Sequence, residues 1–262
     1  MIEINSLLGY YPQAIATNKA FHKHILKEYV ELLALEHLSR SPLVAKIVFI
    51  GGTNLRLVHG IDRFSEDLDF DCKGLTKTEF IALSDEVAKC LRNNGLRVEL
   101  RDKDTSHLTA FRRNLYFPEL LFEMGLSGHR DERFLMKIES QDQGVSYQSQ
   151  SALINCCGFL FPMPVAPKEV LLSMKLSALL TRAKGRDFYD TIFLWQQTSP
   201  DYDFLSDRCG IGTPKALKEA LKEKLSSTDL KLKQRDFEHL LFNTARSAQI
   251  LYFKEFIDEK LS

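Results

Sequence analysis

The sequence predicts an α+β fold followed by a helical bundle, and two observations support this. In the first part of the chain, KIVFI at 46–50 is an apolar β-branched run and DLDFD at 67–71 alternates polar and apolar residues, which is typical of strands. After a proline-rich stretch at 162–167, apolar residues recur at helical spacing. We therefore expect two domains, residues 1–161 and residues 162–262. The first domain is expected to be α+β, with an α/β fold as the alternative.

The elements of the first domain follow from local patterns. The N-terminal segment has apolar residues at helical spacing until Pro42 interrupts it. Thr76 with Glu79 three residues later forms a capping box that starts a helix, and Asn94-Gly95 ends that helix. The expected helices are 12–39, 53–59 and 76–94, and the expected strands are 46–50, 67–71, 96–102, 107–117, 133–140 and 151–160.

The second domain is predicted to contain helices alone. Its apolar residues keep the helical period between short polar interruptions. The expected helices are 167–183, 187–197, 214–226 and 234–260, the last with a break.

The composition limits the function classes. Lysine plus arginine (35) balances aspartate plus glutamate (35), so the chain does not coat nucleic acid by charge alone, although a local basic patch is compatible with it. The five cysteines lack the spacing of a metal site, and adjacent Cys156-Cys157 is an awkward pair to bridge. An odd number of cysteines without a secretory signal indicates reduced thiols in the cytoplasm. No apolar run reaches the ~18 residues of a membrane span, so no membrane partner is expected.

Two carboxylates define the candidate site. Two residues apart on a strand, Asp67 and Asp69 point to the same face, where they repel each other unless a cation lies between them. Mg²⁺ (or Mn²⁺) relieves this repulsion, because it prefers oxygen ligands and shares them with phosphate. The preceding Gly51-Gly52 turn leaves backbone N–H groups accessible, and Thr53 opens a helix whose N-terminal end favours phosphate. The alternative is a surface strand with solvated acids beside a glycine turn.

The segment that contains these residues resembles the signature of a known protein superfamily. The segment GGTNLRLVHGIDRFSEDLDF at 51–70 contains GGT and DLDF, which look like the hG[GS]…Dh[DE]h signature of the polymerase-β-like nucleotidyltransferase superfamily. The whole segment is similar to the AbiEii/AbiGii toxin family, as are KLSALL at 175–180 and RAKGRDFYD at 182–190. The resemblance implies a polymerase-β-like core, a small mixed sheet flanked by helices, with a C-terminal helical bundle domain.

The resemblance also implies a metal site. Asp67 and Asp69 would hold the metal ions, and a third carboxylate is expected on a neighbouring strand. Glu139 in FLMKIES is the candidate, since it shares a strand face with Lys137. A surface glutamate on an edge strand is the alternative for Glu139.

Further roles in the second domain come from the resemblance. Lys175, in the otherwise apolar VLLSMKLSALL, would contact the triphosphate rather than snorkel to solvent, and Arg182 lies seven residues on. Asp187 would orient Lys175 or Arg186, or act near the acceptor, whereas Asp190 is the alternative and could be a helix-start acid. The expected catalytic residues are Asp67, Asp69, Glu139, Lys175 and Asp187, and the expected nucleotide-binding residues are Gly51, Gly52, Thr53, Arg56, Arg63, Ser65, Lys175 and Arg182. Arg56 and Arg63 could equally be salt-bridge partners of Glu66 or Asp71.

The implied function is metal-dependent transfer of a nucleotidyl group from a nucleoside triphosphate to an acceptor by a two-metal mechanism. The family implies the toxin of a toxin–antitoxin or phage-defence system, with a cognate antitoxin as partner and the 3′ end of tRNA as an acceptor. A strand surface carrying Arg97, Arg101, Lys103, Arg112 and Arg113 could face RNA, or these residues could be solvated. Two alternatives remain: a catalytically silent nucleotide-binding protein, and a phosphotransferase (kinase) on the same scaffold.

Overall fold

The chain folds into two compact units in a computed structural model that describes residues 3–101 and 110–262. The first, here called the sheet unit, comprises Met1–Gly60, Phe64–Asp142 and Gln150–Val165. The second, the helical unit, comprises Ile61–Arg63, Gln143–Ser149 and Ala166–Ser262. Two short segments from the first part of the sequence thus belong to the helical unit. The α+β class with C-terminal helices is confirmed, and the expected domain boundary after residue 161 falls within a strand.

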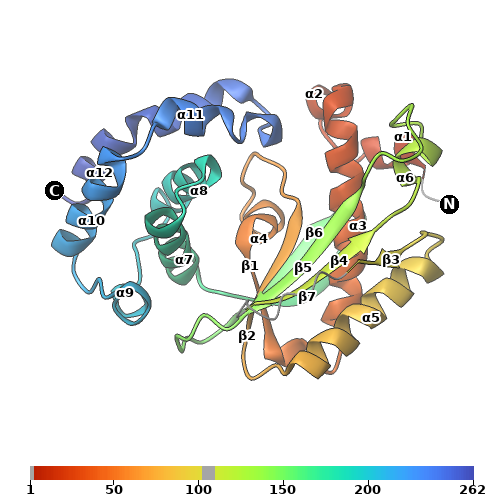
Figure 1. Ribbon diagram of the computed structural model, residues 1–262, viewed down its shortest axis with the longest axis horizontal. Helices are drawn as coiled ribbons and strands as arrows, with labels where there is room; N and C mark the ends of the chain where they lie inside the picture. Colours follow the sequence, from red (N-terminus) through yellow and green to blue (C-terminus); the bar gives the residue numbers. More distant parts are fainter. Residues whose placement is uncertain (1–2, 102–109) are drawn as a thin grey trace. The chain divides into compact units, whose positions relative to one another are not determined.

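A mixed seven-stranded sheet forms the centre of the sheet unit (Figure 1). Its strands are β1 (Ile47–Ile50), β2 (Asp67–Cys72), β3 (Glu99–Leu100), β4 (Phe111–Tyr116), β5 (Leu135–Gln141), β6 (Gln150–Cys156) and β7 (Phe159–Val165). They are ordered β3-β4-β5-β2-β1-β7-β6. β1 is antiparallel to β2, and β2 is parallel to β5. The two central strands β1 and β2 therefore come from the glycine turn segment and the acidic segment of the sequence.

Helices of the sheet unit pack on these strands. They are α1 (Ile4–Leu8), α2 (Gln13–Ala16), η1 (Lys19–Phe21), α3 (His22–Ser39), η2 (Val44–Lys46), α4 (Gly51–Leu57), α5 (Lys77–Asn93) and α6 (Leu120–Glu123). α3 packs against α5 and β7, and α4 packs against β1 and β2. α5 contacts β4, along the β3–β4 end of the sheet (Figure 1). The capping box of Thr76 and Glu79 starts α5 as predicted.

Three predicted elements of this unit were wrong in their bounds. The expected helix 12–39 is divided, because the Asn18 side chain accepts the N–H of Ala20 and starts a new turn, so that α3 begins only at His22. The expected strand 151–160 is a hairpin, β6 and β7, that turns at Cys157-Gly158, where both residues have positive φ. The expected strand 96–102 is reduced to β3, and residues 102 and 107–109 of the predicted strands lie outside the described residues.

Prolines do not end β7, contrary to expectation. Pro162 and Pro164 alternate with the buried Phe161, Met163 and Val165, so the strand keeps its period of two. β7 pairs with β6 along its length, but its register with β1 is limited to Phe49↔Val165. A proline lacks the N–H of a ladder bond and is tolerated where a strand is not paired on that side.

The helical unit is built around α7 (Lys168–Thr181) and α8 (Gly185–Trp195). The further helices are α9 (Tyr202–Cys209), α10 (Pro214–Ser226), α11 (Leu230–Arg235), η3 (Glu238–Leu240), η4 (Thr244–Tyr252) and α12 (Phe253–Lys260). α8 contacts α7, α11, η4 and α12, and most of its residues are buried. The helical stretch expected at 234–260 with a break is divided more than once: α11 ends at Arg235, and a new N-cap, Asn243, starts η4, which leads into α12. Within the described part of the chain, no helix combines the length and apolar character needed to cross a bilayer.

Candidate functional site

The turn between β1 and α4 brings the chain close to the acidic strand. The helix begins at Gly51, two residues earlier than predicted, and Gly51 has a φ of 80°, a region that favours glycine. A Cβ at this position would lie 2.2 Å from Oδ2 of Asp69. The Thr53 hydroxyl donates to the Asp67 carbonyl at 2.6 Å and is buried, so it fixes α4 to β2 rather than facing a ligand. Gly51 therefore allows the backbone to contact a carboxylate that any larger residue would displace.

Three carboxylates lie on adjacent strands of the sheet unit. Asp67 and Asp69 are half-buried on one face of β2, while Leu68 and Phe70 between and after them are buried in the core. β5 runs parallel to β2 with Asp69 opposite Glu139. Paired residues on neighbouring strands point to the same face. The structure thus brings the predicted third carboxylate beside the first two.

Two cations compensate this acidic face. Lys137, opposite Asp67 in the β2–β5 register, places Nζ 3.0 Å from the Asp67 Oδ2. Arg112 on β4 places Nε 2.8 Å from the Glu139 Oε1. The sequence contained a signal for Lys137, since it alternates with Glu139. For Arg112 the sequence suggested either an RNA-facing surface or a solvated side chain, and neither alternative included Glu139. The oxygen-only donor set fits Mg²⁺ or Mn²⁺, which would share these carboxylates with the two cations or replace them.

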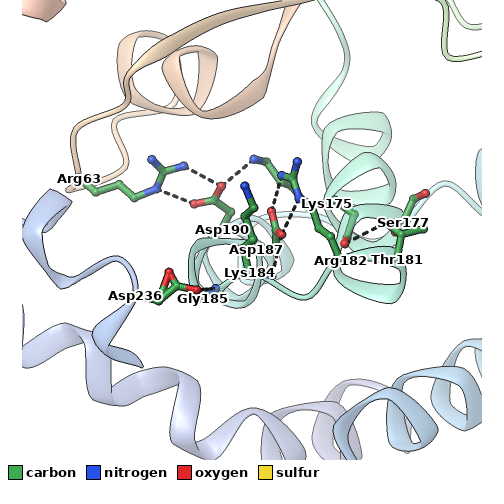
Figure 2. Close-up of polar contacts among 11 residues, drawn as sticks. Arg63, Lys175, Ser177, Thr181, Arg182, Lys184, Gly185, Asp187, Asp190 and Asp236 are labelled. Atoms are coloured by element: carbon green, nitrogen blue, oxygen red, sulfur yellow. Dashed lines mark hydrogen bonds and ion pairs between the residues drawn. The ribbon is translucent and has the colours of Figure 1, made fainter. Parts of the chain in front are cut away.

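A second charged cluster belongs to the helical unit, where Arg63 and Lys175 converge on Asp190 (Figure 2). Arg63 is bidentate: its Nε lies 2.7 Å from Oδ1 and its NH2 lies 2.7 Å from Oδ2 of the carboxylate. Lys175 Nζ lies 2.7 Å from the same Oδ2. Burial alone would raise the pKa of Asp190, but Arg63 and Lys175 outweigh it and hold that pKa at about 2. Asp190 is therefore ionised, and it holds Lys175 in a fixed position.

This cluster corrects two sequence expectations. Lys175 pairs with Asp190 rather than with Asp187, the residue preferred from the sequence. Arg63 is fully buried and forms a bidentate pair with Asp190, so it is a structural ion-pair residue rather than one accessible to a nucleotide. The spacing of RDFYD did not decide between the two, because Asp187 and Asp190 lie three residues apart on one helix face.

Asp187 has a different role at the start of α8. It accepts the backbone N–H of Lys184 at 3.1 Å, which makes it the helix-start acid. It also accepts a bidentate pair from Arg182, at 2.9 Å from Nε and 2.8 Å from NH2 (Figure 2). The Arg182 side chain remains half exposed, whereas Asp187 is buried. Arg182 is therefore held by Asp187 but still presents part of its guanidinium.

Other predicted ligands are placed by their ion pairs. Arg56 on α4 is bidentate to Glu28 of α3, with Nε 2.8 Å from Oε2. Ser65 is buried beside the strand that carries Asp67. Of the proposed RNA-facing residues, Arg97 pairs with Glu119 and Glu123, Arg101 with Glu99, Arg112 with Glu139, and Arg113 with Asp85. Lys103 lies outside the described residues. The paired state of these arginines weakens the prediction of a free basic surface.

The chain is similar in fold to several solved structures. JHP933 from Helicobacter pylori matches with a TM-score of 0.53 and 23% identity, covering 91% of this chain and 93% of that one. MenT4, a nucleotidyltransferase toxin from Mycobacterium tuberculosis, matches with a TM-score of 0.56 and 16% identity, covering 98% and 99%. No curated protein is significantly similar to the chain in sequence.

One family accounts for both segments that carry the candidate site. The family described as "Nucleotidyl transferase AbiEii toxin, Type IV TA system" matches residues 33–259, a range that includes the carboxylates of β2 and β5 as well as α7 and α8. The chain therefore belongs to the AbiEii nucleotidyltransferase toxin family.

Proposed function

We propose that this chain uses a nucleoside triphosphate and divalent metal ions to transfer a nucleotidyl group to an acceptor hydroxyl. The observation that carries the proposal is the contact of Gly51 with Asp69 beside the parallel pair that aligns Asp69 with Glu139. A glycine turn that reaches a set of carboxylates suits a phosphate bridged to metal-bound oxygens. Membership in the family implies a nucleoside triphosphate and a divalent ion in general terms. The choice of Mg²⁺ and of two ions is part of the proposal.

The carboxylates of the sheet unit have the first role. Asp67, Asp69 and Glu139 would hold the metal, which when bound supplies charge neutralisation and a lowered pKa of the attacking hydroxyl. Lys137 and Arg112 keep Asp67 and Glu139 paired with cations. A metal ion at this site would take over the charge compensation that the two cations now supply to the carboxylates.

The charged residues of the helical unit have the second role. Lys175 and Arg182 would offset triphosphate charge, each held by its own aspartate, Asp190 and Asp187. Arg63 supports this set indirectly, because its bidentate pair keeps Asp190 ionised and oriented.

For the acceptor we propose RNA, with the 3′ end of tRNA as the specific case. The support is membership in a toxin family and the similarity of fold to the MenT4 nucleotidyltransferase toxin. A toxin in a toxin–antitoxin or phage-defence system requires a cognate antitoxin protein as partner. Five free cysteines are consistent with a cytoplasmic location, where thiols stay reduced.

The test is a labelling experiment with the purified chain, Mg²⁺, total bacterial RNA and each α-³²P-labelled nucleoside triphosphate in turn. The proposal expects label in RNA of tRNA size with one of the four nucleotides. The Asp67→Asn/Asp69→Asn variant should lose at least about 1,000-fold in rate, since several kcal/mol of charge stabilisation are removed. Glu86→Gln, an exposed acid on α5, is the matched control and should retain the rate.

Label in protein instead of RNA would change the acceptor and keep the chemistry. Equal incorporation by wild type and the Asp67→Asn/Asp69→Asn variant would contradict the assignment of the carboxylates. The absence of label with every nucleotide, although nucleotide binding persists, would favour a silent nucleotide-binding protein.

A further inference from the structure

A second cluster of metal-ligating side chains lies in the sheet unit, at the turn of the β6–β7 hairpin. Cys156 ends β6, and the positive φ of Cys157 (51°) folds the chain back so that the two sulfur atoms lie 3.5 Å apart. Glu28, from the middle of α3, joins them: the donor atoms of Glu28, Cys156 and Cys157 all lie within 4.8 Å of one another. Two thiols and a carboxylate from distant parts of the sequence thus share one small volume.

We propose that Cys156, Cys157 and Glu28 bind one zinc ion at a site separate from the three carboxylates of β2 and β5. Two thiolates and a carboxylate oxygen are common zinc ligands, and zinc is usually four-coordinate. Cys157 also lines a cavity of about 410 Å³ together with Tyr10, Tyr29 and Gly158. The fourth ligand position is therefore assigned to a small molecule or water that enters through this cavity.

Charge conservation favours a divalent ion here. Glu28 is buried and already balanced by Arg56, whose Nε lies 2.8 Å from Oε2. When the two thiols release their protons to solvent and one divalent ion binds, the net charge of the buried cluster does not change. A monovalent ion would leave one uncompensated negative charge, which burial penalises. The sulfur ligands also discriminate against Mg²⁺ and Mn²⁺, which prefer oxygen.

The side chain of Tyr11 lies beside this cluster. The Tyr11 hydroxyl donates to Glu28 Oε1 at 2.8 Å and accepts from Cys157 at 3.5 Å. Tyr11 thus contacts two of the three ligands, as the outer partners of metal ligands do in protein sites.

A disulfide is a weaker explanation of the same cysteine pair. The Cα atoms of adjacent residues lie about 3.8 Å apart across a trans peptide. Ordinary disulfides need Cα atoms roughly 4.4–6.8 Å apart, so a bond between Cys156 and Cys157 would be strained. A metal ion accommodates the observed sulfur separation without joining the two atoms.

The test is a zinc titration of the full chain, reduced and freed of metal with a chelator, in the presence of excess Mg²⁺. A chromogenic zinc indicator competes for the ion, and Cd²⁺ in a parallel titration reports sulfur ligation by its thiolate charge-transfer absorption. We expect one Zn²⁺ per chain and a Cd²⁺ absorption band. Cys156→Ser and Cys157→Ser should each weaken Zn²⁺ binding by more than about 100-fold, beyond the range for outer partners.

Two further variants keep the result interpretable. Tyr11→Phe keeps all three ligands and should weaken Zn²⁺ binding by roughly 10–100-fold, as loss of an outer partner does. Cys90→Ser, a half-buried cysteine on α5, is the matched control and should bind Zn²⁺ as the wild type does. Failure of the reduced wild type to bind Zn²⁺, or unchanged affinity in Cys156→Ser and Cys157→Ser, would overturn the assignment. Nucleotidyl transfer is not used as a readout, so the outcome is independent of the proposed function.

Discussion

Gly51 is the residue on which the geometry of the acidic strand most directly depends. Its backbone has a positive φ, and its missing side chain leaves room for the Asp69 carboxylate. Two separate physical demands therefore meet at one position: a conformation that L-residues rarely adopt and a steric limit set by a functional side chain. The sequence pattern of a strand followed by Gly51-Gly52 indicated the turn, but not which acid the glycine approaches.

These two demands can be separated by comparing Gly51→Ala with Gly74→Ala. Gly74 also has a positive φ (64°), but a Cβ there meets no atom within 4 Å. Both variants should lose roughly 1–2 kcal/mol of folding free energy from the backbone conformation. Gly51→Ala alone should lose about 100-fold or more in transfer rate, because a displacement near 1 Å has that effect in an active site. Urea unfolding and the labelling assay measure the two quantities, and equal rates in the two variants would contradict the role of Gly51.

Asp190 illustrates why side-chain partners cannot be read from sequence alone. Its bidentate partner Arg63 is 127 residues away along the chain, in a short segment that joins the helical unit. The helical period placed both Asp187 and Asp190 near Lys175, but the packing of that segment decides which aspartate receives the lysine. Residue types were therefore predictable for this cluster, and their pairing was not.

The buried Arg63–Asp190 ion pair should make the free energy of unfolding depend on pH. The folded-state pKa of Asp190, about 2, lies below the ordinary value of 3.8. The ionised carboxylate therefore contributes to the free energy of unfolding above pH 4, and this contribution is lost between pH 4 and pH 2. Asp190→Asn should be less stable than wild type by roughly 3–5 kcal/mol at pH 7, because the Arg63 charge stays buried without its partner. The difference should shrink as the pH falls from 4 to 2.

Urea unfolding at several pH values tests this, with Asp203→Asn, an exposed acid on α9, as the control. The control should follow the wild type closely at every pH. A stability difference between Asp190→Asn and wild type that is the same at pH 7 and pH 2 would contradict the ionised pair.

At the scale of elements, sequence patterns predicted those parts of the fold whose signals are local. β1, β2 and α5 lie where periodicity and the Thr76–Glu79 capping box indicated. The β6–β7 hairpin was missed because its turn, Cys157-Gly158, follows an apolar strand that reads as continuous. A break within 234–260 was expected, but the 3-10 character of η4 was not, because its apolar residues keep a helical spacing.

The close packing of α8 against α11 can be tested with a substitution at the start of α8. Gly185 begins α8, and a Cβ there would lie 1.9 Å from the backbone carbonyl oxygen of Lys233 in α11. Gly185→Ala should therefore destabilise the chain by about 1–3 kcal/mol or more, because a backbone carbonyl cannot rotate away as a side chain does. Gly212→Ala, where the nearest atom lies 3.5 Å away, is the matched control and should leave the free energy of unfolding nearly unchanged. Equal unfolding midpoints in urea for the two variants would contradict the close packing of these helices.

At the scale of the molecule, a chain with zero net charge carries its functional charges in two separate sets. The sheet unit holds Asp67, Asp69 and Glu139, and the helical unit holds Lys175 with Arg182. Four of these residues were predicted from the family-like segments at 51–70 and 175–190, whereas Glu139 was predicted from its position on a strand. Their compensating partners come from other elements of each unit, and only the folded chain reveals them.

In the proposed reaction, the α-phosphate is transferred to the acceptor together with its nucleoside. Parallel reactions with RNA, Mg²⁺ and either α-³²P-labelled or γ-³²P-labelled nucleoside triphosphate distinguish this from transfer of the terminal phosphate. We expect that only the α-label enters the acceptor, that EDTA abolishes its incorporation, and that added Mg²⁺ restores it. Incorporation of the γ-label without the α-label would instead identify a phosphotransferase and rule out nucleotidyl transfer.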